Sequence, residues 1–188
     1  MKKIVSLVLA AVLVLSLAAC GDKNNASDGN PVRPTSALNI LETVWNTYGE
    51  DEKFAVVGGD FSEANTREDA PGVFDLKDRA LADSELGLPE TAAVDEAASL
   101  VHMMNANTFT AGAFHVASSS DVDSVVSDLK DNIMNRQWMC GFPDKLVILT
   151  LGDYVISCYG AEDLVDQFSE KVTEAFADAA VVCDEAIA

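Results

Sequence analysis

The segment KLVILTLGDYVISCY, residues 145–159, constrains the fold of this chain most, because two β-rich runs flank the dipeptide Gly152-Asp153. A two-residue connection with glycine first suits the type II′ turn of a β-hairpin. Pairing across this turn places an apolar set on one face: Leu151 with Tyr154, Leu149 with Ile156 and Val147 with Cys158. The opposite face is mixed and carries Leu146, Ile148, Thr150, Val155, Ser157 and Tyr159. We therefore predict an antiparallel hairpin with Cys158 on its core face.

Amphipathic segments surround this hairpin. Apolar residues recur at helical spacing in residues 37–48, part of 74–88, 92–105, 121–139 and 162–177. In the third of these segments, the apolar stripe consists of Val94, Ala97, Ala98, Val101 and Met104. Residues 108–117 are predicted to form a strand. Residues 54–60 and 179–187 are predicted to form either a strand or an irregular packed segment.

The order strand, helix, hairpin, helix in the second half of the chain indicates the architecture. Two amphipathic helices on one face of an antiparallel sheet would bury both of their apolar stripes. We therefore predict an α+β fold in two layers, in which an antiparallel sheet has amphipathic helices packed on one face. No second domain boundary is visible, so residues 37–188 are predicted to form a single domain.

The N-terminus has the pattern of a secretory signal. Lys2 and Lys3 precede an apolar run over residues 4–19, which is slightly short for a membrane span of about 20 residues. An uncleaved membrane anchor is the alternative. The sequence Leu17-Ala18-Ala19-Cys20 resembles the bacterial lipoprotein box. That resemblance implies removal of residues 1–19 as a signal peptide and attachment of diacylglycerol to the Cys20 sulfur.

Lipidation at Cys20 would determine where the protein works. Fatty acyl chains such as palmitate on Cys20 would hold the chain in the cell membrane at its extracytoplasmic face, because two or more chains anchor stably. Residues 21–36, GDKNNASDGNPVRPTS, have almost no large apolar side chains and are predicted to form a flexible tether. The predicted organisation is therefore a signal peptide (1–19), a lipidated cysteine with its tether (20–36), and the domain (37–188).

The chain is strongly acidic, with a formal net charge of -19, and loss of Lys2 and Lys3 with the signal would make it more so. This charge excludes a nucleic-acid partner, which requires basic side chains against phosphates. It also opposes adsorption to anionic lipids, so attachment is expected through the acyl chains alone. The charge permits a cationic peptide or an envelope protein as a partner.

The cysteines exclude two classes of site. With Cys20 acylated, Cys140, Cys158 and Cys183 remain, and no two cysteines have C-x-x-C spacing. A thioredoxin-like redox site and a zinc ribbon are therefore not expected. Two alternatives remain open: one disulfide with one spare thiol, or three free buried thiols.

Soft or borderline metal ligands occur at His102, Met103, Met104, His115, Met139 and Cys140. The histidines lack helical ligand spacing, so core methionines and ordinary histidines are favoured over a metal site. The acidic group Asp60, Glu63, Glu68 and Asp69 could hold calcium but does not match an EF-hand, which favours a solvated loop. Gly58-Gly59 precedes no Lys-Ser/Thr pair and is interpreted as a turn with positive φ. We predict no catalytic residue, metal or cofactor.

Three runs carry a resemblance to a known group of proteins: TVWNTYGEDEKFAVVGGD, DEAASLVHMMNANTFTAGAFHV and NRQWMCGFPDKLVILTLGDYVISCYG. Over about residues 37–188 the chain resembles small lipoproteins of anaerobic Gram-positive bacteria that carry a domain of unknown function. Some of these are labelled bacteriocin transport accessory protein. The resemblance implies an envelope location and a shared fold. Well-understood proteins with that label are similar to thioredoxin and use a C-x-x-C pair, which is missing here.

Three hypotheses follow for the function. The favoured one is a membrane-anchored, non-catalytic binding module that uses the mixed face of the sheet or the acidic loop from Asp60 to Asp69. The second is an accessory role in bacteriocin or peptide export or immunity, with a cationic peptide as partner. The third is an envelope thiol- or metal-dependent enzyme that uses Cys140 with His102 or His115.

Overall fold

The computed structural model describes residues 33–187, and the predictions for the signal peptide and for Cys20 lie outside this range. The helices are α1 (Ala37–Trp45), α2 (Arg79–Leu86), α3 (Val122–Met134) and α4 (Glu162–Ala175), with a 3-10 turn η1 (Ser119–Asp121) before α3. The strands are β1 (Val56–Gly58), β2 (Arg67–Glu68), β3 (Gly72–Phe74), β4 (Val94–His102), β5 (Phe109–Val116), β6 (Lys145–Leu151), β7 (Tyr154–Gly160) and β8 (Ala180–Ala186).

These strands form one eight-stranded sheet in the order β2-β1-β4-β5-β7-β6-β8, and β3 pairs with β4 next to β1. Every pairing is antiparallel. The long strands β4, β5, β7 and β6 form the centre of the sheet. Strand β8 forms one edge, and the short strands β1, β2 and β3 build the other. The antiparallel sheet and the α+β class predicted from the sequence are confirmed.

The β6–β7 hairpin has the predicted register. Leu151 pairs with Tyr154, and the remaining pairs are Leu149 with Ile156 and Val147 with Cys158. Gly152 has φ 59 and fills the position that requires a left-handed backbone, as expected for glycine at the start of a II′ turn. Cys158 is fully buried, so its predicted role as a small core residue is confirmed.

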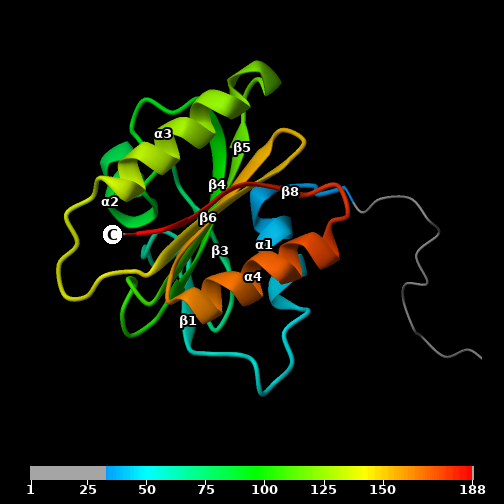
Figure 1. Cartoon of the computed structure of the whole chain (residues 1–188), viewed down its shortest axis with the longest axis vertical. Coiled ribbons are helices and arrows are strands. Elements are labelled where there is room, and N and C mark those ends of the chain that lie inside the picture. Colours follow the sequence, from blue (N-terminus) through cyan, green and yellow to red (C-terminus); the bar gives the residue numbers. More distant parts are fainter. Residues whose placement is uncertain (1–32, 188) are drawn as a thin grey trace, which may run out of the picture. The chain divides into compact units, whose positions relative to one another are not determined.

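Helices cover both faces of the sheet, where the sequence predicted helices on one face only (Figure 1). α1 and α4 pack on the face that carries Val147, Leu149, Ile156 and Cys158. α2 and α3 pack on the other face, over Leu146, Ile148, Val155 and Tyr159. The physical reason is that this second, mixed face is largely apolar. Its exposure would leave four large side chains in water, and the Val125, Leu129 and Ile133 stripe of α3 buries them.

The prediction of a helix over residues 92–105 was wrong, because this segment contains strand β4. A strand in contact with helices on both faces loses the alternation of apolar and polar residues that identifies strands. Ala97 to Val101 are accordingly all buried. The apparent helical stripe resulted from a run of small and apolar residues that is buried on both sides.

The other elements follow their sequence signals closely. Ser36 caps α1, since its Oγ accepts a hydrogen bond from the Asn39 amide at 3.0 Å. α2 occupies the second half of the predicted segment 74–88 and ends at Gly87, which has φ 72. The alternatives for residues 54–60 and 179–187 resolve to strands β1 and β8. Within residues 33–187, no helix is long and apolar enough to cross a membrane.

Gly58, the last residue of β1, and Gly59 pack against the start of β3. A Cβ atom on Gly58 would lie 2.2 Å from the amide nitrogen of Gly72, so only glycine fits there. Gly59 has φ 100, which confirms the predicted turn with positive φ. The buried hydroxyl of Ser99 on β4 also contacts the backbone of Gly59. Together these contacts fix the start of the acidic loop against the sheet.

Candidate functional site

The three described cysteines are free thiols in different surroundings. Cys158 and Cys183 are buried on opposite faces of the sheet, and burial raises the pKa of both thiols. Strand β6 lies between their strands, which puts them about 9–10 Å apart across two strand spacings. A disulfide requires Cα atoms within about 7 Å, so these two cysteines cannot pair in this fold. Cys140 is exposed on the loop before β6, so the alternative of three buried thiols was wrong for this residue.

The two histidines lie at opposite ends of the central strands. The Nδ1 atom of His102, at the end of β4, accepts hydrogen bonds from the amides of Met104 and Asn105, both at 3.3 Å. The Nδ1 atom of His115 on β5 lies 2.6 Å from Asp95 Oδ1, beside the ring of Tyr154. Cys140 belongs to the same end as His102. The structure therefore does not bring His115 together with Cys140.

No metal centre assembles from the predicted ligands. In the part of the chain that the structure describes, no group of three or more His, Cys, Asp or Glu side chains is placed to share a metal ion. Met103, Met104 and Met139 are exposed rather than buried, so the alternative of core methionines was wrong for all three.

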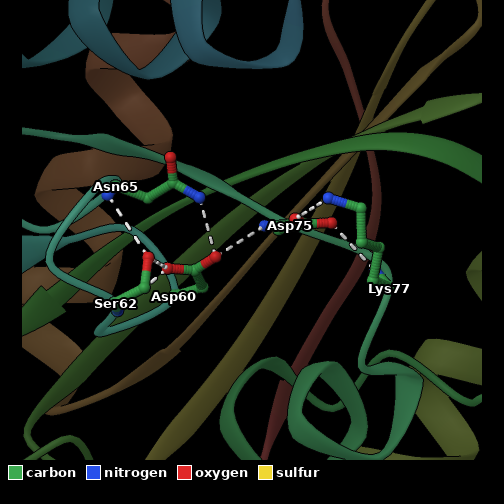
Figure 2. Close-up of polar contacts among 5 residues, drawn as sticks. All are labelled: Asp60, Ser62, Asn65, Asp75 and Lys77. Atoms are coloured by element: carbon green, nitrogen blue, oxygen red, sulfur yellow. Dashed lines mark hydrogen bonds and ion pairs between the residues drawn. The ribbon is translucent and has the colours of Figure 1, made fainter.

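Asp60 is the most heavily hydrogen-bonded carboxylate of the acidic loop (Figure 2). Its Oδ1 accepts hydrogen bonds from the amide, at 3.0 Å, and the hydroxyl of Ser62. Its Oδ2 accepts from Asn65 Nδ2 at 2.7 Å and from the Asp75 amide at 3.3 Å. Partial burial acts to raise the pKa of Asp60, but these hydrogen bonds outweigh it and lower the pKa to about 2. Asp60 is therefore an ionised structural residue that joins the loop to the chain after β3.

The other three acidic residues of this loop do not join Asp60 in a calcium site. Glu63, Glu68 and Asp69 have exposed side chains. Asp69 has φ 55, and its carbonyl accepts a hydrogen bond from Trp45 Nε1 at 3.0 Å. Because donors already occupy both carboxylate oxygens of Asp60, the loop acts as a folded structural unit that presents the remaining carboxylates to solvent.

A depression of ≈ 310 Å³ lies beside the Asp60 network. It is lined by Asn65, Val73, Phe74, Asp75, Leu76, Asp95, Glu96 and Ala97. Each of its carboxylates already has a partner: Lys77 for Asp75, His115 for Asp95 and the Ala37 amide for Glu96. This acid-lined depression is open and favours cations, and its lining contains no Ser, Thr, Cys, His or Lys side chain.

Two further depressions flank the domain. One, of ≈ 290 Å³, is lined by Arg33, Pro34, Leu151, Gly152, Asp153, Tyr154 and Asp178, at the turn of the β6–β7 hairpin. The other, of ≈ 420 Å³, is lined by Trp45, Glu50, Lys53, Phe54, Ala55 and Asp69. Both combine charged and apolar walls, and neither is lined by a Cys, His, Ser or Thr side chain.

A cluster of exposed apolar side chains lies at the end of the sheet away from the hairpin turn. We call Met103, Met104, Met139 and Phe142 the Met–Phe surface; their side chains are 45%, 81%, 80% and 74% exposed. Asn107 Nδ2 joins the two loops by donating to the carbonyls of Met139 and Gly141 at 3.0 and 2.9 Å. Asn105 Nδ2 donates to the Cys140 carbonyl at 3.4 Å. This surface therefore stands on two loops that are held together.

Sequence reasoning missed most of these surface residues. The helix predicted over residues 92–105 concealed the contribution of Asp95 and Glu96 to the depression. The methionines were considered only as metal ligands or core residues. One signal was available: residues 137–143, QWMCGFP, contain no charged side chain in a chain with 31 acidic residues.

Two features of the described domain are thus open to a partner, the acid-lined depression and the Met–Phe surface. The mixed face of the hairpin is not, because α2 and α3 cover it. Comparison of the chain with protein-family models, curated proteins and solved structures found no match.

Proposed function

We propose that this chain is a lipid-anchored extracytoplasmic protein that works as a non-catalytic binding module. The anchorage is supported by the signal-like N-terminus and by Leu17-Ala18-Ala19-Cys20. The binding role is supported by one observation above all: the domain exposes four large apolar side chains on two loops that hydrogen bonds hold together. Contiguous exposed apolar surface on a folded domain marks interaction sites.

The anchorage is tested by mass spectrometry of the protein isolated from its native membrane. We expect a chain that begins at Cys20 with a diacylglyceryl group on its sulfur. Cys20→Ala should leave the signal uncut and the N-terminal residue unmodified. An unmodified thiol at Cys20, or an intact leader in the wild type, would overturn the anchorage.

The binding role is tested by chemical crosslinking on intact cells, followed by identification of the crosslinked proteins. Recovery of a defined envelope protein or peptide in reproducible yield is expected. A variant with the same anchor but without residues 37–188 serves as the control for neighbours captured through the membrane alone. Recovery of the same proteins with both chains would mean that the domain binds nothing itself.

An accessory role in peptide export or immunity is a second candidate, favoured by the acidic charge and by the three carboxylates that line the depression. Its partner would be a cationic peptide. Binding should weaken sharply with salt, because exposed charges are screened within about 10 Å at 0.1 M ionic strength. Genes for an exporter and a small basic peptide next to the gene for this chain would support it, whereas salt-insensitive binding would eliminate it.

The thiol-enzyme hypothesis gains no support from the geometry. Among residues 33–187, the Cys140 thiol forms no hydrogen bond to the ring of His102 or His115. Activation of a thiol as a nucleophile requires such a neighbouring base or another positive environment.

A further inference from the structure

The Met–Phe surface has a chemistry that limits what can bind to it. The two loops beneath it, MMNANTF over residues 103–109 and QWMCGFP over 137–143, have no charged side chain. The chain has 31 acidic and 12 basic residues, so two adjacent loops without charged side chains differ clearly from the rest of its surface. Of the eight large apolar side chains exposed in the described part of the chain, four belong to it.

The side chains of this surface suit an apolar partner of variable shape. Methionine is unbranched and polarisable, so it adapts to irregular apolar surfaces and is frequent at binding sites that accept several partners. Phe142 adds a rigid aromatic ring, and it is 74% exposed. The amides of Asn105 and Asn107 hold the loops in place, which lowers the entropy cost of ordering them on binding.

Carboxylates border the same end of the domain. Asp144 follows Phe142 by two residues, and its amide donates to the Gly160 carbonyl at 2.8 Å. Glu162 and Asp163 begin α4, directly after Ala161, whose amide donates to the Thr108 carbonyl at 2.8 Å. All three side chains are exposed, and within residues 33–187 none forms an ion pair. The apolar area is thus bordered by unpaired negative charge.

From this arrangement we infer that the Met–Phe surface binds a basic amphipathic segment of a partner protein or peptide, an inference that rests on the proposed binding function. The apolar side of the segment packs on Met104, Met139 and Phe142, and its Lys and Arg side chains face Asp144, Glu162 and Asp163. Recognition of amphipathic helices by apolar surfaces uses this combination of contacts. A second copy of this acidic chain or an anionic bilayer would bring like charges together.

The test uses the full chain and a synthetic amphipathic helix of leucine and lysine, about five turns long. A peptide of the same composition, scrambled to remove the apolar face, and a leucine–glutamate version are the controls. Fluorescence anisotropy should show that the amphipathic basic peptide binds at least about tenfold more tightly than either control. A tenfold change in Kd corresponds to about 1.4 kcal/mol. Equal binding of the scrambled peptide would show non-specific charge attraction and overturn the inference, as would the absence of binding.

Matched variants locate the site. Combined Met104→Gln, Met139→Gln and Phe142→Ser should weaken peptide binding about tenfold or more, whereas Val181→Thr with Val182→Thr, exposed on β8, should not change it. Combined Asp144→Asn, Glu162→Gln and Asp163→Asn should weaken binding and reduce its salt dependence. Glu63→Gln with Glu68→Gln and Asp69→Asn removes the same number of charges from the acidic loop and is the matched control. An equal loss of peptide binding in the control variants would show that the peptide does not bind at the Met–Phe surface.

Four outcomes separate this inference from the proposed function. If a partner is recovered by crosslinking on cells and still binds the variant with Met104, Met139 and Phe142 substituted, the binding role stands. That outcome would refute the Met–Phe surface as the binding site. Self-association of the full chain that requires Phe142 would make a second copy the occupant of the surface and refute the basic segment. Binding of the domain to phosphatidylglycerol vesicles that requires Phe142 would make a lipid surface the occupant and refute it equally. Failure to recover any partner would refute the function itself.

Discussion

The hydroxyl of Ser99 accepts a hydrogen bond from the amide of Gly59 at 2.8 Å and donates one to the carbonyl of the same residue at 2.9 Å. Ser99 is fully buried on β4, and the two residues are 40 positions apart in the chain. One side chain therefore satisfies both backbone polar groups at the glycine where the acidic loop begins.

Ser99→Ala should lower the free energy of unfolding by about 1–3 kcal/mol, because it leaves buried backbone groups without a partner. Ser124→Ala, at an exposed position of α3, should change stability by less than about 0.5 kcal/mol. Urea denaturation of the two variants and the wild type gives the comparison. Equal stability of both variants would mean that water replaces the Ser99 hydroxyl at no cost.

Asp60 should make stability depend on pH in the acidic range. Its folded pKa of about 2 is lower than the value of about 3.9 in an unfolded chain, so its contribution is complete above pH 4. That contribution is lost as the pH falls from about 4 to about 2. Asp60→Asn, which places an amide opposite the donors of Asn65 and Asp75, should cost about 1–3 kcal/mol at pH 7 and little at pH 2.

Denaturation at a series of pH values tests this, with Glu63→Gln on the same loop as the control. The difference between the wild type and the Asp60 variant should shrink with acidity, and the Glu63 variant should follow the wild type throughout. A difference that stays constant from pH 7 to pH 2 would show that the effect is steric rather than ionic.

Gly58 and Gly152 should differ in their response to alanine because they are glycine for different reasons. A Cβ on Gly58 would lie within 2.5 Å of backbone atoms of Gly72 and Ala70, so Gly58→Ala should cost at least about 3 kcal/mol. A Cβ on Gly152 meets nothing within 4 Å and only the φ of 59 opposes it, at a cost of about 1–2 kcal/mol. Thermal denaturation ranks the two, and the reverse order would contradict the packing of β1 on β3.

Thiol reactivity should distinguish Cys140 from the other described cysteines. A thiol reagent such as dithionitrobenzoate should modify Cys140 quickly in the folded chain, and Cys158 and Cys183 only after denaturation. Cys140→Ser should abolish the fast reaction. A second fast thiol in the wild type would indicate that the Cys20 sulfur is unmodified, and rapid reaction of Cys158 would contradict its burial.

Local signals predicted the hairpin best, because Gly152-Asp153 and the two apolar runs fix the turn, the register and the core face together. Ser36 and Gly87, which cap α1 and α2, are residue types that favour these helix ends, so local sequence also accounts for these two boundaries. Strand β4 was missed because coverage by helices on both faces removes the alternation on which strand prediction depends. That coverage is a tertiary property, and no local pattern in residues 92–105 contains it.

The candidate site was less predictable than the fold. Asp60 was identified as part of an acidic loop, but its hydrogen bond from the Asp75 amide depends on how β3 returns beside β1. The contact between the loops of Asn107 and Met139 joins positions 32 residues apart, and no spacing rule anticipates it.

The two ends of the β6–β7 hairpin mark two different ends of the domain. Arg33 and Pro34, the first residues that the structure describes, border its turn, and the Met–Phe surface lies at its open end, about 20 Å away along seven-residue strands. The apolar tip thus lies at the end of the domain opposite to Arg33 and Pro34, where the proposed tether would join it. A partner bound at that tip would leave the end of the domain that receives the proposed tether free.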